Sequence, residues 1–131
     1  MIVLDASAAI ELILGLPLSE QVRNRLVQGN WHVAAPQLLV VEVLQVLRRR
    51  VLAGSTSHSD ADEALDLLDD LGIHYFDHQS LVGRVWQLRD NCSAYDASYV
   101  ALAEALDAEL LTLDARLAQA PGLVCGFQLI D

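Results

Sequence analysis

The chain begins Met1-Ile2-Val3-Leu4-Asp5-Ala6-Ser7, a short apolar run that ends at an acidic residue. A run of this length predicts a buried β-strand over residues 1–5. The sequence after Asp5 favours a helix over roughly 6–14, which Gly15 ends. A buried strand that passes directly into a helix is a typical first unit of an open α/β sheet, so this stretch sets the expectation for the whole fold.

The same alternation of short apolar runs and longer helical patterns continues to the end of the chain. The further predicted strands are 31–35, 73–76, 109–113 and 127–130, and the further predicted helices are 19–29, 36–53, 60–72, 78–90, 94–107 and 115–119. Pro36 is expected in the first turn of its helix. Strands separated by helices indicate a three-layer α/β/α fold with a central, mostly parallel sheet. At 131 residues, we expect a single domain over 1–131.

The composition is that of a soluble, folded protein. The chain is 53% hydrophobic and has few Gly and Pro residues, which argues against disorder. No stretch approaches the roughly 18 apolar residues of a membrane span. No Lys or Arg precedes Arg23, so the basic start of a secretory signal is missing. The expectation is a cytoplasmic protein with no membrane partner.

The net charge of −10 limits the ways in which this chain could bind nucleic acid. Phosphate contacts normally dominate such binding, so an acidic chain needs metal ions or local arginines to offset repulsion. All eight basic residues are arginines, and Arg48-Arg49-Arg50 is their one cluster. This cluster either contacts phosphate or forms the solvated end of a helix, where cations complement the helix dipole.

Four acidic residues interrupt or end apolar stretches of the chain: Asp5, Glu42, Asp96 and Asp114. In an open α/β sheet, strand ends and the neighbouring helices meet at one crevice. A carboxylate that is desolvated there is normally paired or bound to a metal. We therefore expect the four acids to meet around a divalent metal.

Three of these acids also have purely structural interpretations. Asp5 and Asp114 precede predicted helices and could act as N-caps. Ser93 and Asp96 are spaced as a capping box, in which each side chain bonds to the backbone N–H of the other residue. Capping and ligand binding occur at the same strand-to-helix junctions, so neither interpretation excludes the other.

Glu42 is different because it lies inside a predicted helix, where no N-cap is needed. Its structural alternative is an exposed polar stripe, because Glu42, Gln45 and Arg49 fall on one helix face. The side chains on either side, Val41 and Val43, are apolar. Both interpretations stay open at this stage.

Metal chemistry accounts for the residue types. Mg²⁺ and Mn²⁺ prefer hard oxygen ligands, and Mg²⁺ often takes one or two carboxylates and keeps several waters. Such ions activate a water, hold a scissile phosphate and neutralise the leaving oxygen. The two cysteines and four histidines have no zinc-ligand spacing. The predicted cofactor is therefore Mg²⁺ or Mn²⁺.

Four motifs, in order, resemble the PIN-domain ribonucleases, and the length and motif order are similar to those of the VapC toxins of bacterial toxin–antitoxin pairs. The motifs are Ile2-Val3-Leu4-Asp5-Ala6-Ser7, the mid-helix Glu42, Tyr95-Asp96-Ala97-Ser98-Tyr99-Val100-Ala101-Leu102-Ala103 and Leu111-Thr112-Leu113-Asp114-Ala115-Arg116-Leu117. The resemblance covers essentially the whole chain.

The resemblance implies a Mg²⁺- or Mn²⁺-dependent endoribonuclease that hydrolyses phosphodiester bonds of single-stranded or looped RNA through a metal-activated water. Carried over by position, the catalytic and metal-binding quartet is Asp5, Glu42, Asp96 and Asp114. Ser7 and Thr112 match flanking hydroxyl positions that orient a ligand or water. The family also implies a homodimer and a cognate VapB-type antitoxin whose C-terminal tail crosses the site, often with an arginine among the acids.

Other classes of protein fit less well. A receiver-like signalling module would need a lysine near its acidic site, and this chain has no lysine. A haloacid-dehalogenase-type phosphatase would need Asp-x-Asp after the first strand, where this chain has Asp5-Ala6-Ser7. The alternative that stays open is a catalytically silent PIN-like module that binds metal or RNA without cutting it.

Overall fold

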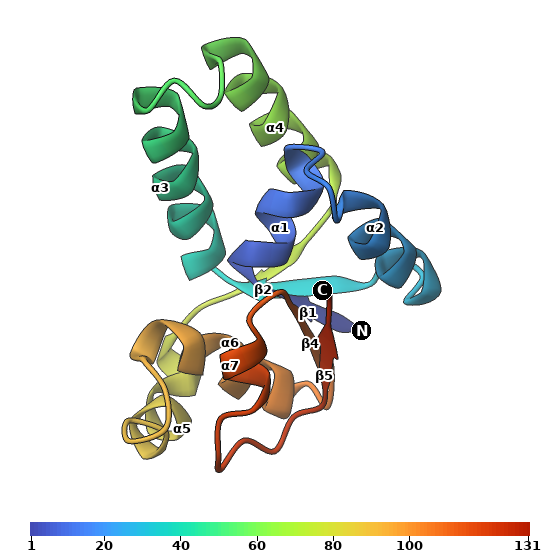
Figure 1. Cartoon of the computed structure of the whole chain (residues 1–131). Coiled ribbons are helices and arrows are strands. Elements are labelled where there is room, and N and C mark those ends of the chain that lie inside the picture. Colours follow the sequence, from blue (N-terminus) through green and yellow to red (C-terminus); the bar gives the residue numbers. More distant parts are fainter.

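A parallel five-stranded sheet forms the centre of the computed structural model, which describes residues 1–131 (Figure 1). The strands are β1 (Ile2–Leu4), β2 (Val33–Pro36), β3 (His74–Phe76), β4 (Glu109–Thr112) and β5 (Phe127–Leu129). Their order is β3-β2-β1-β4-β5, and every neighbouring pair is parallel. The chain's first strand is therefore the middle strand, and its partner β4 ends beside it.

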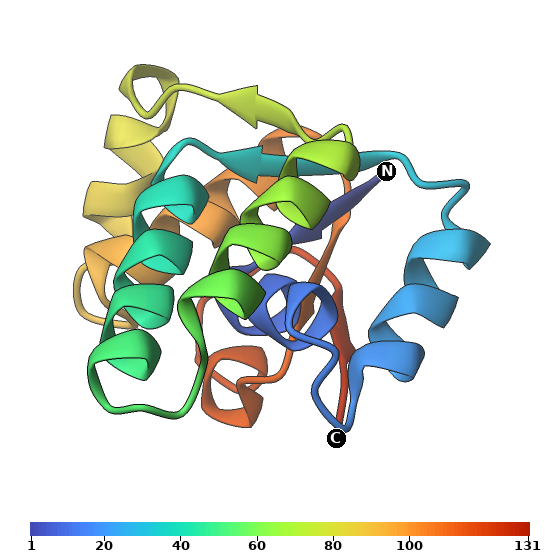
Figure 2. The same cartoon turned by 90° about the horizontal axis from the view of Figure 1, so that it is seen from above.

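Helices cover both faces of this sheet. They are α1 (Ala6–Ile13), α2 (Ser19–Gln28), α3 (Leu38–Leu52), α4 (His58–Asp70), α5 (Val82–Gln87), α6 (Ala94–Ala105) and α7 (Ala115–Ala118), with a 3₁₀ helix η1 (Gln79–Leu81) before α5. Figures 1 and 2 show α1 to α4 on one side of the sheet and α5 and α6 on the other. The predicted three-layer α/β/α fold is confirmed.

The central strands and α6 form the rigid centre of the molecule. Strands β1 and β2 are buried along their whole length, as expected for parallel strands covered on both faces. In α6, the seven consecutive residues 97–103 are all buried, because the helix packs between the sheet and the segment that contains η1 and α5. A helix that is apolar on every side belongs in such an enclosed position. The first turn of α6 is therefore firmly placed relative to β1 and β4.

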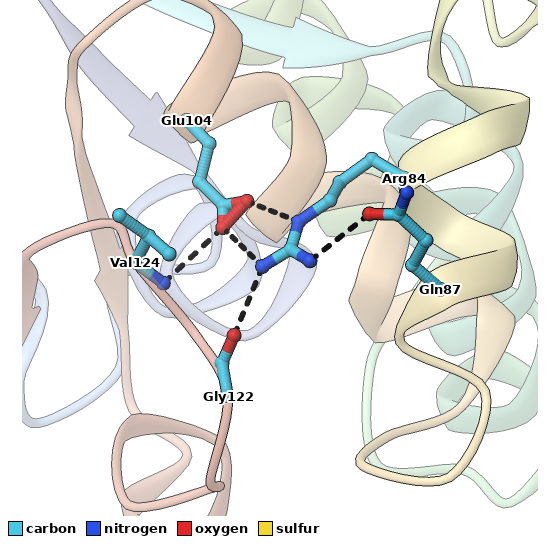
Figure 3. A network of polar contacts seen from close by, with 5 residues as sticks. All are labelled: Arg84, Gln87, Glu104, Gly122 and Val124. Carbon is cyan, nitrogen blue, oxygen red and sulfur yellow. Dashed lines mark hydrogen bonds and ion pairs between the residues drawn. The ribbon is translucent and has the colours of Figure 1, made fainter.

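An arginine–glutamate pair fastens α6 to the elements around it (Figure 3). Arg84 of α5 donates from Nε to Glu104 Oε1 at 2.6 Å, and from its Nη2 to Glu104 Oε2 at 3.1 Å. The same Nη2 donates to the carbonyl oxygen of Gly122 at 2.9 Å, and the Val124 N–H donates to Glu104 Oε2 at 3.2 Å. Bidentate pairing of this kind is geometrically specific, so it ties α5, α6 and the segment before β5 together.

The prediction of a strand over 31–35 followed by a helix with Pro36 in its first turn is wrong by a few residues. Trp31 has a positive φ of 57° and lies in the turn after α2, so the strand begins only at Val33. Pro36 ends β2, and α3 begins at Leu38. The pairing of β2 with β1 stops at Ala34, so the missing N–H of Pro36 removes no bond from that ladder.

The prediction of one helix over 78–90 is also wrong. The structure divides it into η1 and the short α5, and turns follow from residue 88. Gly83 lies at the start of α5, where glycine lowers helix propensity. In addition, His78 Nε2 accepts the backbone N–H of Leu38 at 3.1 Å, which ties the segment to α3. Across the whole structure, no helix combines the length and apolar character needed to cross a membrane.

Candidate active site

The four predicted acids come from four different elements at one end of the sheet. Asp5 follows β1 and Asp114 follows β4, and these two strands are adjacent and parallel, so both acids lie at the same edge. Asp96 lies in the first turn of α6, on one face of the sheet. Glu42 lies in α3, on the other face. The site therefore spans all three layers.

Asp5 is the most enclosed of the four and is satisfied by hydrogen bonds. Its residue is only 7% exposed. Its Oδ1 accepts the backbone N–H of Ala8 at 3.0 Å and the hydroxyl of Ser7 at 2.6 Å, and its Oδ2 accepts the hydroxyl of Thr112. Asp5 is thus the N-cap of α1, as the sequence suggested, and also the centre of a polar network.

The two hydroxyls around Asp5 are oriented by backbone groups from the end of β4. Ser7 Oγ accepts the N–H of Leu113 at 3.1 Å, and Thr112 Oγ1 accepts the N–H of Asp114 at 3.0 Å. Because these N–H groups occupy hydroxyl lone pairs, each hydroxyl proton is directed at the Asp5 carboxylate. Ser7 and Thr112 were predicted to flank the acids, and the structure places both in direct contact with Asp5.

Glu42 is half-buried and bonded across the site. Tyr99 of α6 donates its hydroxyl to Glu42 Oε1 at 2.5 Å. Gln45 and Arg49, the other members of the suggested polar stripe, are exposed. The exposed polar stripe therefore consists of Gln45 and Arg49, whereas Glu42 faces α6.

Tyr99 is the contact that the sequence analysis missed. It is only 2% exposed, and burial, followed by its bond to Glu42, raises the pKa of Tyr99 well above its usual range. A signal existed, because Tyr99 follows Asp96 by three residues and so shares its helix face. A buried tyrosine hydroxyl also normally has a partner. The partner lies on α3, and sequence spacing alone could not identify it.

The carboxylate of Asp114 takes part in helix capping, whereas that of Asp96 does not. Asp114 Oδ1 accepts the N–H groups of Arg116 at 3.0 Å and Leu117 at 3.2 Å, which makes it the N-cap of α7. Ser93 Oγ accepts the N–H of Asp96 at 3.1 Å, which is one half of the predicted capping box. The other half, a bond from the Ser93 N–H to the Asp96 carboxylate, is not formed. The Asp96 carboxylate is thus free of backbone bonds.

The four acids lie within electrostatic range of one another. Burial raises the pKa of Asp5, and the nearby charge of Asp96 adds to the increase. Burial likewise raises the pKa of Glu42, with further contributions from Asp96 and Asp5. For Asp96, burial again raises the pKa, and the charge of Asp114 adds to it. Each acid is therefore linked to at least one other by repulsion, as expected for a shared anionic site.

No cation of the chain neutralises this charge by direct pairing. The single ion pair in the structure joins Arg84 and Glu104, outside the site. No three His, Cys, Asp or Glu side chains converge closely enough to enclose a metal ion by themselves. The donors are nevertheless all oxygens, which suit Mg²⁺ or Mn²⁺. The arrangement fits an ion held by one or two carboxylates that keeps most of its waters.

Comparisons with known proteins show the family of the chain. The PIN domain family matches residues 2–123. Ribonuclease VapC1 of Mycobacterium tuberculosis is 44% identical over 129 residues, which cover 98% of this chain and 96% of that protein. Ribonuclease VapC9 of the same species is 38% identical over 125 residues, which cover 95% of this chain and 94% of that protein. The chain belongs to the PIN-domain family, as its motifs predicted.

Solved structures have the same fold. VapBC2 from Rickettsia felis, bound to a DNA fragment from its promoter, superposes with a TM-score of 0.75 at 17% identity and covers 100% of both chains. Mycobacterium tuberculosis VapC20, a sarcin-ricin loop cleaving toxin, superposes with a TM-score of 0.69 at 18% identity and covers 95% of this chain and 97% of that one. At these identities, the likeness concerns the fold.

Replacing Tyr99 with Phe tests the bond across the site. The variant keeps the buried ring but loses the donor to Glu42, so we expect it to lose about 1 kcal/mol of stability at neutral pH. The loss should shrink near pH 4, because a protonated Glu42 accepts a weaker hydrogen bond than a carboxylate does. Urea unfolding at both pH values measures this. A loss of equal size at both pH values would contradict an ionised Glu42 as the partner.

The raised pKa values of Asp5, Glu42 and Asp96 predict how stability depends on pH without metal. Between about pH 4, where free carboxyl groups titrate, and the higher values in the fold, the folded protein binds more protons than the unfolded chain. The free energy of unfolding contributed by these groups therefore decreases as pH rises through this window. Glu42→Gln removes one such group, so its stability should decrease less steeply.

Urea midpoints measured in EDTA across this pH range give the comparison. Asp62→Asn is the matched control, because Asp62 is exposed on α4, away from the site. We expect the difference in stability between Glu42→Gln and wild type to grow as pH rises, and the Asp62→Asn curve to stay parallel to wild type. A Glu42→Gln curve parallel to wild type would show that the fold does not raise the pKa of Glu42.

Proposed function

We propose that this chain is an endoribonuclease of the VapC type, the toxin of a type II toxin–antitoxin pair, which hydrolyses RNA phosphodiester bonds with Mg²⁺ or Mn²⁺. Residues 1–131 would form one PIN domain. The observation that carries the proposal is the gathering of Asp5, Glu42 and Asp96 at one sheet edge without a pairing cation. The two relatives described above, named as ribonucleases, support the same reaction.

Asp5, Glu42 and Asp96 would hold the principal metal, directly or through water. When bound, the metal would supply a more acidic water and would neutralise charge on the scissile phosphate. Hydrogen bonds to Ser7, Ala8 and Thr112 fix the Asp5 carboxylate, and Oδ2 keeps a lone pair for a ligand. Tyr99 holds the Glu42 carboxylate in the same way, because it binds Oε1 and leaves Oε2 free. The carboxylates of Asp5 and Glu42 therefore need little rearrangement to bind a metal.

Asp114 would complete the site. Its Oδ1 caps α7, which leaves Oδ2 to accept a hydrogen bond from the attacking water or to hold a second ion. Water placed in this way attacks phosphorus in line with the leaving ribose oxygen, and correct placement contributes much of the rate. None of the groups that contact the four acids is a histidine or a lysine, so carboxylates are the chain's own proton acceptors here.

We also infer two protein partners, a VapB-type antitoxin and a second copy of the chain, and a cytoplasmic location. A VapB-type antitoxin would place an arginine of its tail among the acids, because an anionic site that attracts metal also attracts a guanidinium. The VapBC2 structure from Rickettsia felis supports pairing of this fold with such a partner. A second copy of the chain would cover exposed apolar side chains such as Val82 and Trp86 of α5, which are 63% and 66% exposed.

RNA hydrolysis that depends on metal tests the function. With Mg²⁺ or Mn²⁺, wild type should release RNA fragments with defined ends, and EDTA should abolish this. Asp96→Asn should lower the rate by about 100-fold or more, because it removes a charge that faces the metal. Asp62→Asn, on the exposed face of α4, should cleave as wild type does.

The silent-module alternative makes the opposite prediction for turnover. A protein that only binds would shift RNA in a gel in the presence of metal but would release no fragments. Equal cleavage by wild type, by Asp96→Asn and in EDTA would instead identify a contaminating nuclease and remove the proposal.

A further inference from the structure

A hollow of about 380 Å³ lies between α3 and the start of α6, directly beside the candidate active site. The residues that matter for its chemistry are Leu38, Val41, Glu42, Gln45, Arg49 and Tyr95. Small-ligand pockets measure roughly 300–1,000 Å³, so the volume suits a single flat molecule. We call this hollow the Tyr95 hollow. Glu42 of the acidic quartet forms part of its wall, so a molecule bound there would lie next to the reacting phosphate.

Tyr95 presents an aromatic ring to this hollow. It immediately precedes Asp96 and is 64% exposed, although most of the helix that follows it is buried. Its backbone is held by the Ser98 hydroxyl, which donates to the Tyr95 carbonyl oxygen at 2.7 Å. An exposed ring on a fixed backbone next to apolar Leu38 and Val41 is the kind of surface on which a nucleobase stacks.

Arg49 contributes a positively charged side chain to the Tyr95 hollow. Of the three adjacent arginines, it alone lines the Tyr95 hollow. Arg50 turns elsewhere, since its Nε donates to Thr56 at 2.9 Å. Arg49 is exposed, and its guanidinium forms neither an ion pair nor a hydrogen bond with any residue of the chain. In a chain with a net charge of −10, an uncommitted guanidinium beside the acids is well placed to contact a phosphate.

We propose that the Tyr95 hollow is the subsite for one unpaired nucleotide of the RNA, next to the scissile phosphate. Tyr95 stacks on the base, and Arg49 contacts the phosphate of that nucleotide. The subsite requires single-stranded RNA, because the base of a duplex is already paired and stacked. The inference rests on the proposed ribonuclease function and adds the two residues, Tyr95 and Arg49, that would position one nucleotide of the substrate.

A neighbouring hollow favours a different occupant. It shares Leu38 and Tyr95 with the Tyr95 hollow but is otherwise lined mainly by apolar side chains, among them Val82 and Trp86, and it contains no arginine. A surface of that kind suits a second protein chain. The Tyr95 hollow has Gln45, Arg49 and Glu42 on its walls, and polar groups of both signs suit a nucleotide better. Association of the Tyr95 variants must therefore be measured alongside RNA cleavage.

The first test removes the ring. On a short single-stranded RNA that spans a mapped cleavage junction, Tyr95→Ala should raise KM by about 5- to 150-fold, the range found when one stacked base loses its aromatic partner. Tyr95→Phe, which keeps the ring, should retain the wild-type KM. Tyr75→Ala is the matched control, because Tyr75 is 40% exposed on β3 and does not line the hollow. The same RNA is then made with an abasic residue at each position around the junction.

One abasic position should raise the wild-type KM and leave that of Tyr95→Ala unchanged, which identifies the stacked base. A penalty for Tyr95→Ala that persists on every abasic RNA overturns the subsite, as does an unchanged KM. A change in mass by light scattering that accounts for the lost activity would assign the ring to an interface between copies. If wild type binds RNA without cutting it, the proposed function fails, and the same comparison of dissociation constants by fluorescence anisotropy still tests the subsite.

The second test concerns charge. Loss of one phosphate contact to a single strand should reduce the slope of log KM against log salt by about 0.7. We expect this change for Arg49→Gln. Arg48→Gln is the control, because Arg48 is exposed on the same helix but lies outside the hollow. Equal slopes for both variants would remove Arg49 from the subsite.

Discussion

The desolvated carboxylate of Asp5 is the constraint on which the site depends. A buried charge is tolerable only when hydrogen bonds satisfy it, and here the hydroxyls of Ser7 and Thr112 and the N–H of Ala8 do so. Those hydroxyls are in turn aligned by backbone N–H groups at the end of β4. The same bonds therefore offset part of the free-energy cost of burying the Asp5 carboxylate and hold it at the sheet edge. They also hold the end of β1 against the end of β4.

The hydrogen bond between Tyr99 and Glu42 connects the two faces of the sheet at the site. Glu42 is on one face and Tyr99 is on the other, and their hydrogen bond joins α3 to α6 beyond the strand ends. Tyr99 can do this because it lies in the buried stretch 97–103 of α6, and the packing of this stretch prevents the helix from rotating easily. The apolar packing of α6 thus has a chemical consequence, since it fixes both Asp96 and the donor to Glu42. The remaining mutual repulsion is the part of the site that a divalent cation would relieve.

Sequence alone predicts the features that depend on local pattern. Asp5 and Asp114 could be placed at one edge because each follows an apolar strand, and parallel strands end together. Features set by tertiary partners were missed or misplaced. Pro36 ends a strand because β3 pairs with it, and the partner of Tyr99 comes from α3, 57 residues away in sequence. Likewise, the triplet Arg48-Arg49-Arg50 looks uniform in sequence, yet the three side chains face different surroundings.

The strongly acidic character of the chain bears on how it could bind RNA at all. With a net charge of −10, long-range attraction cannot draw the polyanion in, and few cations are available to release counterions. Affinity must then come mainly from short-range interactions, and contacts such as that of Arg49 with a phosphate add only a small salt-dependent part. Metal coordination by the acids is one such short-range interaction, and stacking on an exposed ring such as Tyr95 is another. Both act only on a phosphate and a base already in place, so repulsion from the rest of the surface would disfavour any RNA that cannot present an unpaired nucleotide there.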